Sequence, residues 1–456
     1  MSGHRAADVA VIGAGLAGLT AARELTRSGH SVVVLEANER VGGRTVNVEV
    51  APGVVADGGG QWVGPGQDHI LALIDELGLA TFDTHIHGRH VYLRDGRRKL
   101  FTGPIPPMSR AAFADFAQAQ LRLERMARSV PVDRPWAAKR ARRWDGTTFG
   151  RWIDVNTLTR EARRLLTLCF TIVNGEDPHS TSLLLMLSRI ASAGGIGHLI
   201  EVTGGAQETR VAGGTQLIAL TIAERLGDRV VLGSPVTEVV RDGDGALVRS
   251  HRAEVRARHV IVAMAPADAD RIRFTPELPV RRAALQRKWH NGTESKLFAV
   301  YDRPFWRDQG LSGMALTDLP VAGFVIDNSP PDGSLGILLT FVGTAGAGYG
   351  LTWSDEILDD PEARRAAFVA DLTTIFGPRA AHPVDLLEKD WAHEPWISGC
   401  VAARAPGLTT QYTTALTDPV GRVHWASAET ATRNEGYMDG AVSEGKRVAQ
   451  RIAREL

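Results

Sequence analysis

The chain opens with Val9-Ala10-Val11-Ile12-Gly13-Ala14-Gly15-Leu16-Ala17-Gly18, an apolar run followed by glycines in the pattern G-x-G-x-x-G. The apolar run predicts a buried strand, and the glycines mark where a helix over residues 16–28 begins. Gly13 allows a tight turn, Gly15 lets the backbone approach a pyrophosphate, and Gly18 lets the helix pack close to the strand. The start of a helix also attracts phosphate charge. The stretch therefore predicts a dinucleotide-binding turn.

A second strand and an acidic residue complete this unit. Residues 31–35 are Ser-Val-Val-Val-Leu, and Glu36 follows them 23 positions after Gly13, where a carboxylate can accept a ribose hydroxyl. The chain continues as Arg40-Val41-Gly42-Gly43-Arg44, in which the arginine forks can hold the pyrophosphate from its far side. This continuation resembles flavoproteins of the glutathione-reductase-like type, which embed FAD. It favours FAD over a diffusible nicotinamide.

Length and composition limit the function classes. The chain has 456 residues, 44% of them hydrophobic, which is enough for two domains or more. Lys and Arg together number 52, as do Asp and Glu, so no net charge favours nucleic acid or an anionic membrane as a partner. The sequence contains no run of about 18 apolar residues, so it predicts no membrane anchor. The polar residues 1–7 do not resemble a signal peptide.

The two cysteines, Cys169 and Cys400, lie far apart and form neither a disulfide framework nor a metal-binding spacing. This usage suits a reducing compartment, so we expect a cytoplasmic protein. We interpret Cys169, within an apolar helical run, as a core residue.

The pattern along the chain predicts two interleaved domains. Residues 229–232, 236–240 and 259–263 predict strands that return to the nucleotide domain, whereas 108–128, 159–173, 180–193 and 361–376 carry apolar residues at helical spacing. We expect a mixed α/β fold, with a glutathione-reductase-like Rossmann domain that binds FAD and a substrate domain of sheet and helices. The predicted FAD-binding domain comprises residues 1–81, 212–285 and 394–456, and the predicted substrate-binding domain comprises 82–211 and 286–393.

A second informative region lies near the C-terminus. A predicted strand ends at Ser427-Ala428-Glu429-Thr430, and Gly436-Tyr437-Met438-Asp439-Gly440-Ala441 opens the last helix. The free N–H groups and the dipole of such a glycine-lined helix start favour the negative charge of a reduced flavin ring.

With these segments, the chain resembles the flavin-containing monoamine oxidase family over nearly its whole length. Six motifs occur in the order that the family has. They are the N-terminal FAD motif, residues 58–65 (GGGQWVGP), residues 204–207 (GGAQ), residues 295–297 with 304–307, the segment around Cys400, and residues 429–430 with 436–441.

The resemblance implies FAD as cofactor and gives roles to single residues. Lys296 would hold a water at flavin N5, and Val236 would contact the adenine through its backbone. Cys400 matches the position at which family members join sulfur to the flavin 8α carbon, and a free cysteine beside a non-covalent flavin stays an equal alternative. Together, motif and resemblance give as cofactor-binding residues Gly13, Gly15, Gly18, Glu36, Arg40, Gly43, Arg44, Gly60, Gln61, Trp62, Val236, Cys400, Glu429, Tyr437 and Met438.

The resemblance also implies a substrate cavity in front of the flavin. Well-known members hold the amine between two tyrosines; Tyr437 fits one position, but Val401 occupies the other, so half of the aromatic cage is missing. Lys296 and Tyr437 are the expected catalytic residues. The other cavity residues would be Trp62, Thr171, Ile172, Ile200, Gln207, Phe324, Phe341 and Trp391, beside Val401. Such mainly apolar walls favour a neutral amine and a substrate with a hydrophobic body.

The activity implied is oxidation of a primary amine, or of a secondary one, to an imine that hydrolyses to an aldehyde or ketone plus ammonia, with O2 reduced to H2O2. The partners expected are a small-molecule amine, O2 and, as an option, a second copy of the chain. Four alternatives stay open. An L-amino-acid oxidase would place an arginine in the cavity, and a polyamine oxidase an acidic group, for which Glu435 is a candidate. A flavin-dependent desaturase or biosynthetic dehydrogenase would give little peroxide, and a non-catalytic flavin-binding module would oxidise no amine.

Other chemistries find little support in the sequence. It contains no G-x-S-x-G motif, and no lysine in a glycine-rich loop precedes Ser or Thr. His85, His87 and His90 lie close together, but zinc prefers a fourth ligand and closed geometry. We interpret the three histidines as part of an exposed strand and turn, and we expect no metal.

Overall fold

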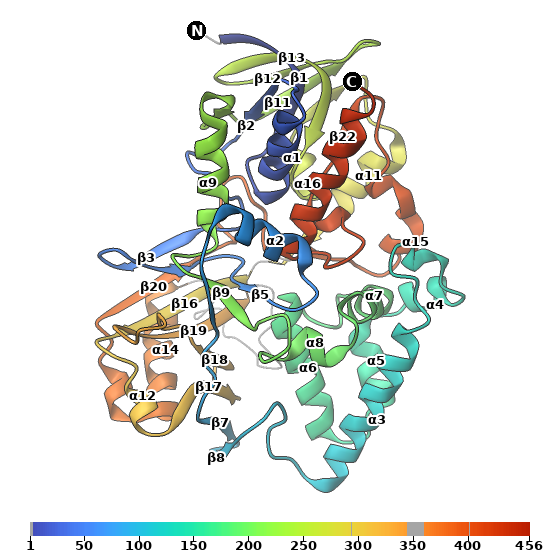
Figure 1. The fold of residues 1–456 in the computed structure, drawn as a ribbon. Helices are drawn as coiled ribbons and strands as arrows, with labels where there is room; N and C mark the ends of the chain where they lie inside the picture. Colours follow the sequence, from blue (N-terminus) through green and yellow to red (C-terminus); the bar gives the residue numbers. More distant parts are fainter. Residues whose placement is uncertain (1–2, 293, 344–359, 401) are drawn as a thin grey trace.

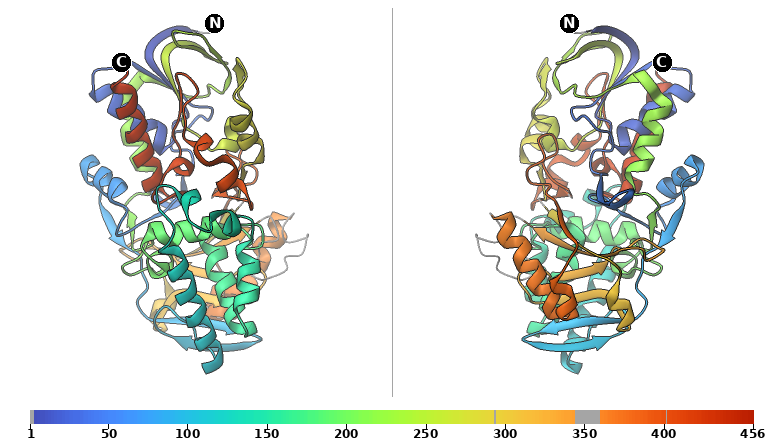
Figure 2. Two further views of the ribbon diagram at one scale, coloured as in Figure 1. Left: turned by 90° about the vertical axis from the view of Figure 1, so that its right-hand side faces the viewer. Right: turned by 90° about the vertical axis from the view of Figure 1, so that its left-hand side faces the viewer.

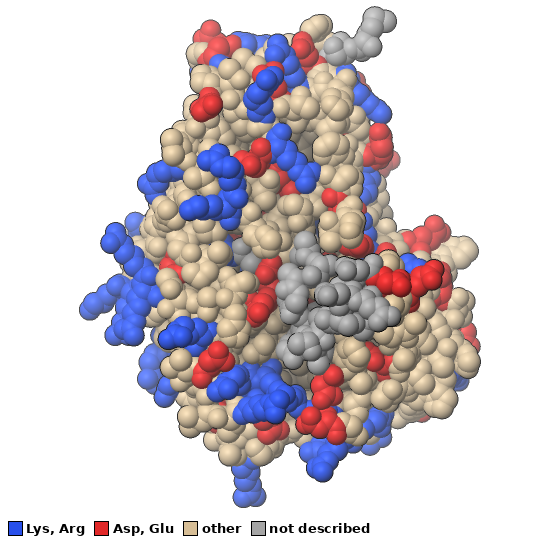
Figure 3. Space-filling view, turned by 180° about the vertical axis from the view of Figure 1, so that it is seen from behind, with Lys and Arg blue, Asp and Glu red and all other residues tan. Residues whose placement is uncertain are grey.

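Two large sheets and a group of helices form the chain, of which the computed structural model describes residues 3–292, 294–343, 360–400 and 402–456. In Figure 1 one sheet lies at the top, near both termini, the second sheet lies at the lower left, and the helices lie at the lower right. Two side views show the same stacking of an upper and a lower half (Figure 2). Lys and Arg side chains are interspersed with Asp and Glu over the rear face (Figure 3).

The upper sheet is built around parallel strands. β1 (Gly3–Ile12) pairs in parallel with β2 (Val32–Leu35) and with β13 (Ala253–Val262), and β13 pairs in parallel with β22 (Val423–Trp425). Residues 9–12, 32–35 and 260–262 of the first three strands are continuously apolar, which is typical of strands buried on both faces. The sheet also contains β10 (Val230–Val231), β11 (Val236–Arg241), β12 (Ala246–Ser250) and β14 (Arg273–Thr275).

The predicted strands are present, and two of them are longer than predicted. β1 begins at Gly3, before the apolar run that starts at Val9, and β13 begins at Ala253 rather than His259. The two extensions pair with one another, from Gly3 with Ala253 to Ala7 with Ala257. The sequence does not show these extensions as apolar runs, because they mix polar and apolar residues and only alternate residues of the β13 extension are buried.

Helices cover one face of the upper sheet. They are α1 (Leu16–Arg27), α2 (Asp68–Leu77), α9 (Gln216–Leu226) and α16 (Met438–Ala453), and their apolar residues share one buried cluster with Val9, Val11 and Val34. The opposite face, with Ala10, Ile12 and Leu35, packs against residues of β11, β12 and β14. The glycine-rich end of β1 is thereby held where α1 begins.

The lower sheet has seven strands. In order they are β20 (Asp385–Lys389), β16 (Glu294–Tyr301), β19 (Gly336–Gly343), β18 (Phe324–Asp327), β17 (Leu311–Thr317), β7 (Arg89–Arg94) and β8 (Arg97–Phe101). Alternate residues of β16 divide between the two faces: Leu297 and Ala299 join the cluster under α14 (Pro361–Phe376), whereas Phe298 and Val300 join the opposite cluster. Lys296 shares the face of Phe298, because side chains alternate along a strand.

The helical part contains the predicted helices close to their predicted bounds. They are α3 (Arg110–Ala127), α6 (Arg160–Asn174) and α7 (Leu183–Ala193), packed with α4 (Ala141–Asp145), α5 (Phe149–Asn156) and α8 (Ile196–Ile200). Ser109, Thr159 and Ser182 each precede a helix, and their hydroxyl oxygens accept hydrogen bonds from N–H groups of the first turn. The cap at Ser182 is the reason that α7 begins at residue 183 and not at 180.

Short elements connect these parts. The small sheets are β3 (Asn47–Ala51) with β4 (Val54–Asp57), β5 (Trp62–Val63) with β9 (Thr209–Val211) and β6 (Thr81–Asp83), and β15 (His290–Asn291) with β21 (Ala402–Ala403); the short helices are α10 (Pro266–Ala269), α11 (Val280–Lys288), α12 (Phe305–Asp308) and α15 (Leu408–Tyr412). Within the described ranges, no helix is both long enough and apolar enough to cross a membrane. The mixed α/β class is confirmed. The division at residues 81, 211, 285 and 393 remains our proposal.

Gly18 should be needed for stability, because a Cβ at this position would overlap the Gly13 carbonyl oxygen and lie 3.0 Å from the Ala263 Cβ. We expect Gly18→Ala to lower the free energy of unfolding by about 1–3 kcal/mol. Gly243→Ala is the control, since a Cβ there meets no atom within 4 Å. It should change stability by less than about 0.5 kcal/mol. Denaturant unfolding of both variants checks this, and equal stability would contradict the close helix-strand contact.

Candidate active site

One cavity of about 650 Å³ runs between the upper and lower halves. At one end it is lined by the glycine-rich turn and the tip of β2, and at the other by residues of the lower sheet and helices. Predicted cofactor residues that line it are Gly13, Gly15, Glu36, Gly43, Arg44, Gly60, Gln61, Trp62, Val236, Cys400, Tyr437 and Met438. Segments from the first and the last parts of the chain therefore meet around one space.

The turn after β1 has the geometry that a nucleotide needs. Gly13 has φ 105°, a left-handed conformation that favours glycine. Gly15 is the N-cap of α1, and no side chain caps the helix, so its first N–H groups can bind an anion. Glu36 is buried, and its carboxylate accepts hydrogen bonds from the N–H groups of Ala14 (2.6 Å) and Asn38 (2.9 Å).

Three predicted residues support the cavity from behind its lining. Gly18 packs against Gly13, and Arg40 donates a hydrogen bond to the Gly43 carbonyl at 2.8 Å. Glu429 is fully buried and accepts hydrogen bonds from Arg44 at 2.5 and 3.1 Å. Arg44 also donates to the Cys400 carbonyl at 2.7 Å. The pairing keeps the pKa of Glu429 low and raises the pKa of Arg44 despite burial.

Lys296 lies in the middle of the cavity wall and is 5% exposed. Its Nζ donates to the carbonyl oxygens of Asp57 (2.9 Å) and Gly59 (2.7 Å) and to Oε1 of Gln61 (2.8 Å). The Nζ also lies 5.4 Å from the ring centre of Trp62. Burial lowers the pKa of Lys296 to about 8. An ammonium has three donors, so a water beside it must share one of these hydrogen bonds.

Cys400 and Tyr437 close the cavity near the start of α16. Tyr437 is the N-cap of this helix, and burial raises the pKa of its phenol. Burial also raises the pKa of the Cys400 thiol to about 11, against the influence of Arg44 and Lys296. Val401, the expected substitute for the second cage tyrosine, lies outside the described residues.

The far end of the cavity is mainly apolar. Of the predicted cavity residues, Trp62, Ile172, Ile200, Gln207, Phe324 and Phe341 line it, together with Ile86, Met314, Leu316 and Ile326. The rings of Phe324 and Phe341 are stacked with their centres 6.2 Å apart. Gln207 adds an amide whose Nε2 donates to the Leu199 carbonyl at 3.3 Å.

Two predicted cavity residues do not line it. Thr171 is 2% exposed, and its hydroxyl donates to the Thr167 carbonyl one turn back on α6. Trp391 is 1% exposed and lies behind Gly59, with its indole N–H donating to the Gly58 carbonyl at 2.9 Å. Cys169, which we interpreted as a core residue, lines the cavity as well as packing against the helical core.

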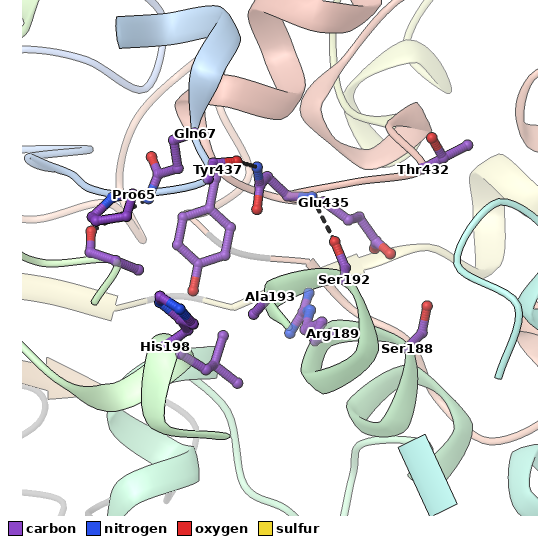
Figure 4. Close-up of a pocket in the computed structure, with 14 residues that line it drawn as sticks. Pro65, Gln67, Ser188, Arg189, Ser192, Ala193, His198, Thr432, Glu435 and Tyr437 are labelled. Atoms are coloured by element: carbon purple, nitrogen blue, oxygen red, sulfur yellow. Dashed lines mark hydrogen bonds between the residues drawn. The ribbon is translucent and has the colours of Figure 1, made fainter. Parts of the chain in front are cut away.

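Sequence reasoning missed a charged cluster beside Tyr437. Arg189 of α7 lines both the large cavity and a small adjoining pocket of about 50 Å³, and Glu435 and Tyr437 line the same two spaces. Figure 4 shows Arg189, Glu435 and Tyr437 around the small pocket. A signal existed in the sequence, since Arg189 interrupts the apolar run Leu-Leu-Leu-Met-Leu-Ser-Arg-Ile-Ala of a buried helix.

The histidines are arranged differently from our expectation of an exposed strand and turn. The rings of His85 and His87 lie edge to face at 5.6 Å, but His90 is buried, lines the cavity and contacts Ser312 Oγ through Nδ1 at 2.7 Å. In the described ranges, a different group has three ligand atoms within 4.8 Å of one another: His259, His424 and Glu455. It lies away from the cavity lining.

The residues present fit a flavin dinucleotide. The glycine turn, the uncapped start of α1 and Glu36 suit the pyrophosphate and ribose, and the cavity continues to Lys296, Cys400 and Tyr437.

Comparison with known proteins agrees with this geometry. The family model described as flavin containing amine oxidoreductase matches residues 16–453. The AofH protein of Mycobacterium tuberculosis is 41% identical over 450 residues, covering 98% of this chain and 97% of the relative. Flavin-containing amine oxidase A of Equus caballus is 36% identical over 464 residues, covering 100% of this chain and 86% of the relative.

Solved structures are similar over the whole fold. Wild-type putrescine oxidase bound to putrescine has a TM-score of 0.92 at 34% identity, covering 99% of this chain and 100% of that chain. Cyclohexylamine oxidase from Brevibacterium oxydans IH-35A also has a TM-score of 0.92, at 35% identity, covering 98% of this chain and 99% of that chain. The chain therefore belongs to the flavin-containing amine oxidoreductase family, and its cofactor is FAD.

Proposed function

We propose that this enzyme oxidises a primary amine that has a single amino group and a hydrophobic body, and secondary amines of similar shape. The products are H2O2 from O2 and an imine, which hydrolyses to an aldehyde or ketone plus ammonia, or plus a primary amine where the substrate is a secondary amine. The observation that carries the proposal is the apolar wall formed by Trp62, Ile172, Ile200, Phe324 and Phe341 beside Lys296. This wall would bind the body of the substrate and remove water from its amine.

The bound FAD would supply the two-electron chemistry, and the side chains would position and tune it. We propose that Gly13, Gly15, Glu36, Arg44 and Val236 bind the dinucleotide, with Gly18, Arg40 and Glu429 supporting them. The apolar walls and the nearby cations disfavour a protonated amine, so the substrate would be held in its neutral form. Tyr437 would orient the amine, and Lys296 would stabilise negative charge that develops when O2 takes up electrons.

An amino-acid oxidase is the second candidate, because the cavity does contain an arginine. Arg189 is buried, and its Nη1 already donates to the Asn174 side chain. Glu435 stands on its other side as an acidic neighbour. A substrate carboxylate would therefore meet both a cation and an anion, which makes this candidate weaker than a monoamine oxidase.

The polyamine alternative loses support from the same residues. Glu435, its candidate anchor, is 8% exposed, and its Oε1 lies 2.8 Å from Nη2 of Arg404. An acid with an arginine partner offers a substrate ammonium much less attraction than a free acid would.

A matched pair of substrates tests the proposal. We expect 2-phenylethylamine to bleach the flavin absorbance under anaerobic conditions at least about tenfold faster than L-phenylalanine, which differs from it only by a carboxylate. On admission of air, about one H2O2 should form per amine oxidised. Faster reduction by L-phenylalanine would indicate an amino-acid oxidase, little peroxide a dehydrogenase, and no reduction by any amine a non-catalytic module.

Lys296 should control the reaction with oxygen. We expect Lys296→Met to slow reoxidation of the reduced enzyme by about 100-fold, with normal flavin content, because a buried cation near the developing charge is lost. Since the pKa of Lys296 is about 8, the wild-type rate should be constant at lower pH and fall as pH rises past that value.

Stopped-flow mixing with O2 across pH 6–10 measures both effects. Lys389→Met is the matched control, because Lys389 pairs with Lys296 across the strands but does not line the cavity. A pH-dependent rate in Lys296→Met equal to that of the wild type would exclude the role proposed for Lys296.

Cys400 should carry the flavin covalently. Its thiolate would bond to the 8α carbon in place of a proton, and O2 would take up the two electrons that this attachment leaves on the flavin. Because burial raises its thiol pKa to about 11, we expect slow attachment that accelerates about tenfold per pH unit at neutral pH, as the thiolate fraction grows. After acid precipitation, the yellow colour should stay with the wild-type protein. It should appear in the supernatant with Cys400→Ser, whereas Cys169→Ser, the other cavity cysteine, should behave as the wild type. Release from all three proteins would establish a non-covalent flavin.

A further inference from the structure

The charged cluster beside Tyr437 suggests how the enzyme selects among amines, an inference that rests on the proposed function. Arg189 is 5% exposed, Glu435 is 8% exposed and Arg404 is 7% exposed, so all three are held in the protein interior. Arg189 and Glu435 face the large cavity, whereas Arg404 pairs with Glu435 from behind. Water can screen these charges only weakly at such burial.

Hydrogen bonds connect this cluster to Arg44, one of the residues that we expect to bind FAD. Nη2 of Arg404 donates to the Glu429 carbonyl at 3.3 Å, and the carboxylate of Glu429 binds Arg44. The described part of this cluster thus contains three guanidinium groups and two carboxylates. These five groups have one more positive than negative charge, and Arg189 is the cation among them that lines both the large cavity and the small pocket beside Tyr437. The rest of the cavity lining also contains charges of both signs, from Glu36, Glu201, Asp268, Arg271, Glu294 and Lys296.

We propose that Arg189 is a specificity residue that rejects amines with a second positive charge. A monoamine can enter in its neutral form and leaves the cluster undisturbed. A diamine of the same length keeps an ammonium at its far end, which must share a weakly screened cavity with the guanidinium of Arg189. Selection by repulsion of the wrong ligand is an established way to gain specificity.

The same geometry explains why Glu435 does not reverse the selection. Its carboxylate faces Arg404 at 2.8 Å and also lies in the field of Arg189. At Glu435, the second ammonium of a diamine would have to compete with the guanidinium groups of Arg404 and Arg189. The putrescine oxidase structure, at 34% identity, shows that this fold can bind a diamine, so the scaffold by itself does not impose the selection.

The test compares 1-aminohexane with 1,6-diaminohexane, which differ by one amino group. For each enzyme, the dissociation constants come from perturbation of the flavin spectrum, and kcat/KM comes from peroxide formation. We expect Arg189→Met to increase binding and kcat/KM for the diamine relative to the monoamine by about tenfold or more. Arg189→Lys, which keeps the charge but not the fork of donors, should leave the ratio within about threefold of the wild type.

A reciprocal variant makes the test independent of the folding of Arg189→Met. Glu435→Gln removes a negative charge, so it should change the ratio in the opposite direction, against the diamine. Flavin content and the thermal midpoint identify variants that do not fold. An unchanged ratio in folded Arg189→Met, or a higher diamine ratio in Glu435→Gln, overturns the proposal. If neither amine reduces the wild-type flavin, the proposed oxidation fails, and the dissociation constants still decide the role of Arg189.

Discussion

The ion pair between Arg44 and Glu429 joins the parts of the chain on which the site depends. Arg44 follows the second strand, Glu429 follows the last strand, and the same guanidinium binds the carbonyl of Cys400. A buried ion pair is weak evidence for stability, because desolvation offsets much of the attraction. Its value here is positional. It fixes two segments almost four hundred residues apart in the sequence against the wall of one cavity.

Lys296 is also a buried charge that pays a desolvation cost. Unlike Arg44, it has no carboxylate within hydrogen-bonding distance among the described residues. Its three donors meet two carbonyl oxygens and one amide oxygen, all from residues 57–61. These neutral acceptors replace the hydration shell but supply no negative charge, so the pKa falls. A lysine held in this way can exist in both charge states near neutral pH. That property suits a residue which must respond to charge changes in a cofactor.

The sequence predicts the parts of this protein that repeat a local rule. The glycine turn, the β-branched strands and the capped helices each follow from residues within a few positions, and they are found at their predicted places, with β1 and β13 extended at their N-terminal ends. The residues of the cavity wall are harder to predict, because helical spacing does not show which face of a helix points into the cavity. Thr171 and Ile172 are neighbours on α6 and about 100° apart around the helix. Only Ile172 lines the cavity.

Residues that lie behind the cavity wall are harder still to place from the sequence. Trp391 lies one layer behind the cavity wall, because Gly59 stands between it and the cavity. Gly59 has no side chain, so the indole ring can pack directly against its backbone. His259 and His424 meet at 3.1 Å because parallel pairing aligns β13 with β22, and burial lowers the pKa of His424 to about 4. Nothing local to either histidine predicts that contact. Arg189 did leave a local trace, a charge within an apolar helix, but its meaning depends on Glu435 and Arg404 from the distant C-terminal region.

These charges and the apolar walls act on a substrate in the same direction. Hydrophobic surroundings raise the cost of a protonated amine, and the nearby cations Arg189 and Lys296 raise it further. A wall of aromatic rings alone would attract an ammonium through cation–π contacts, as the Lys296 ammonium over Trp62 illustrates. The buried arginines counteract that attraction. In the function that we propose, the cavity would bind the hydrophobic body of an amine and still favour its neutral form.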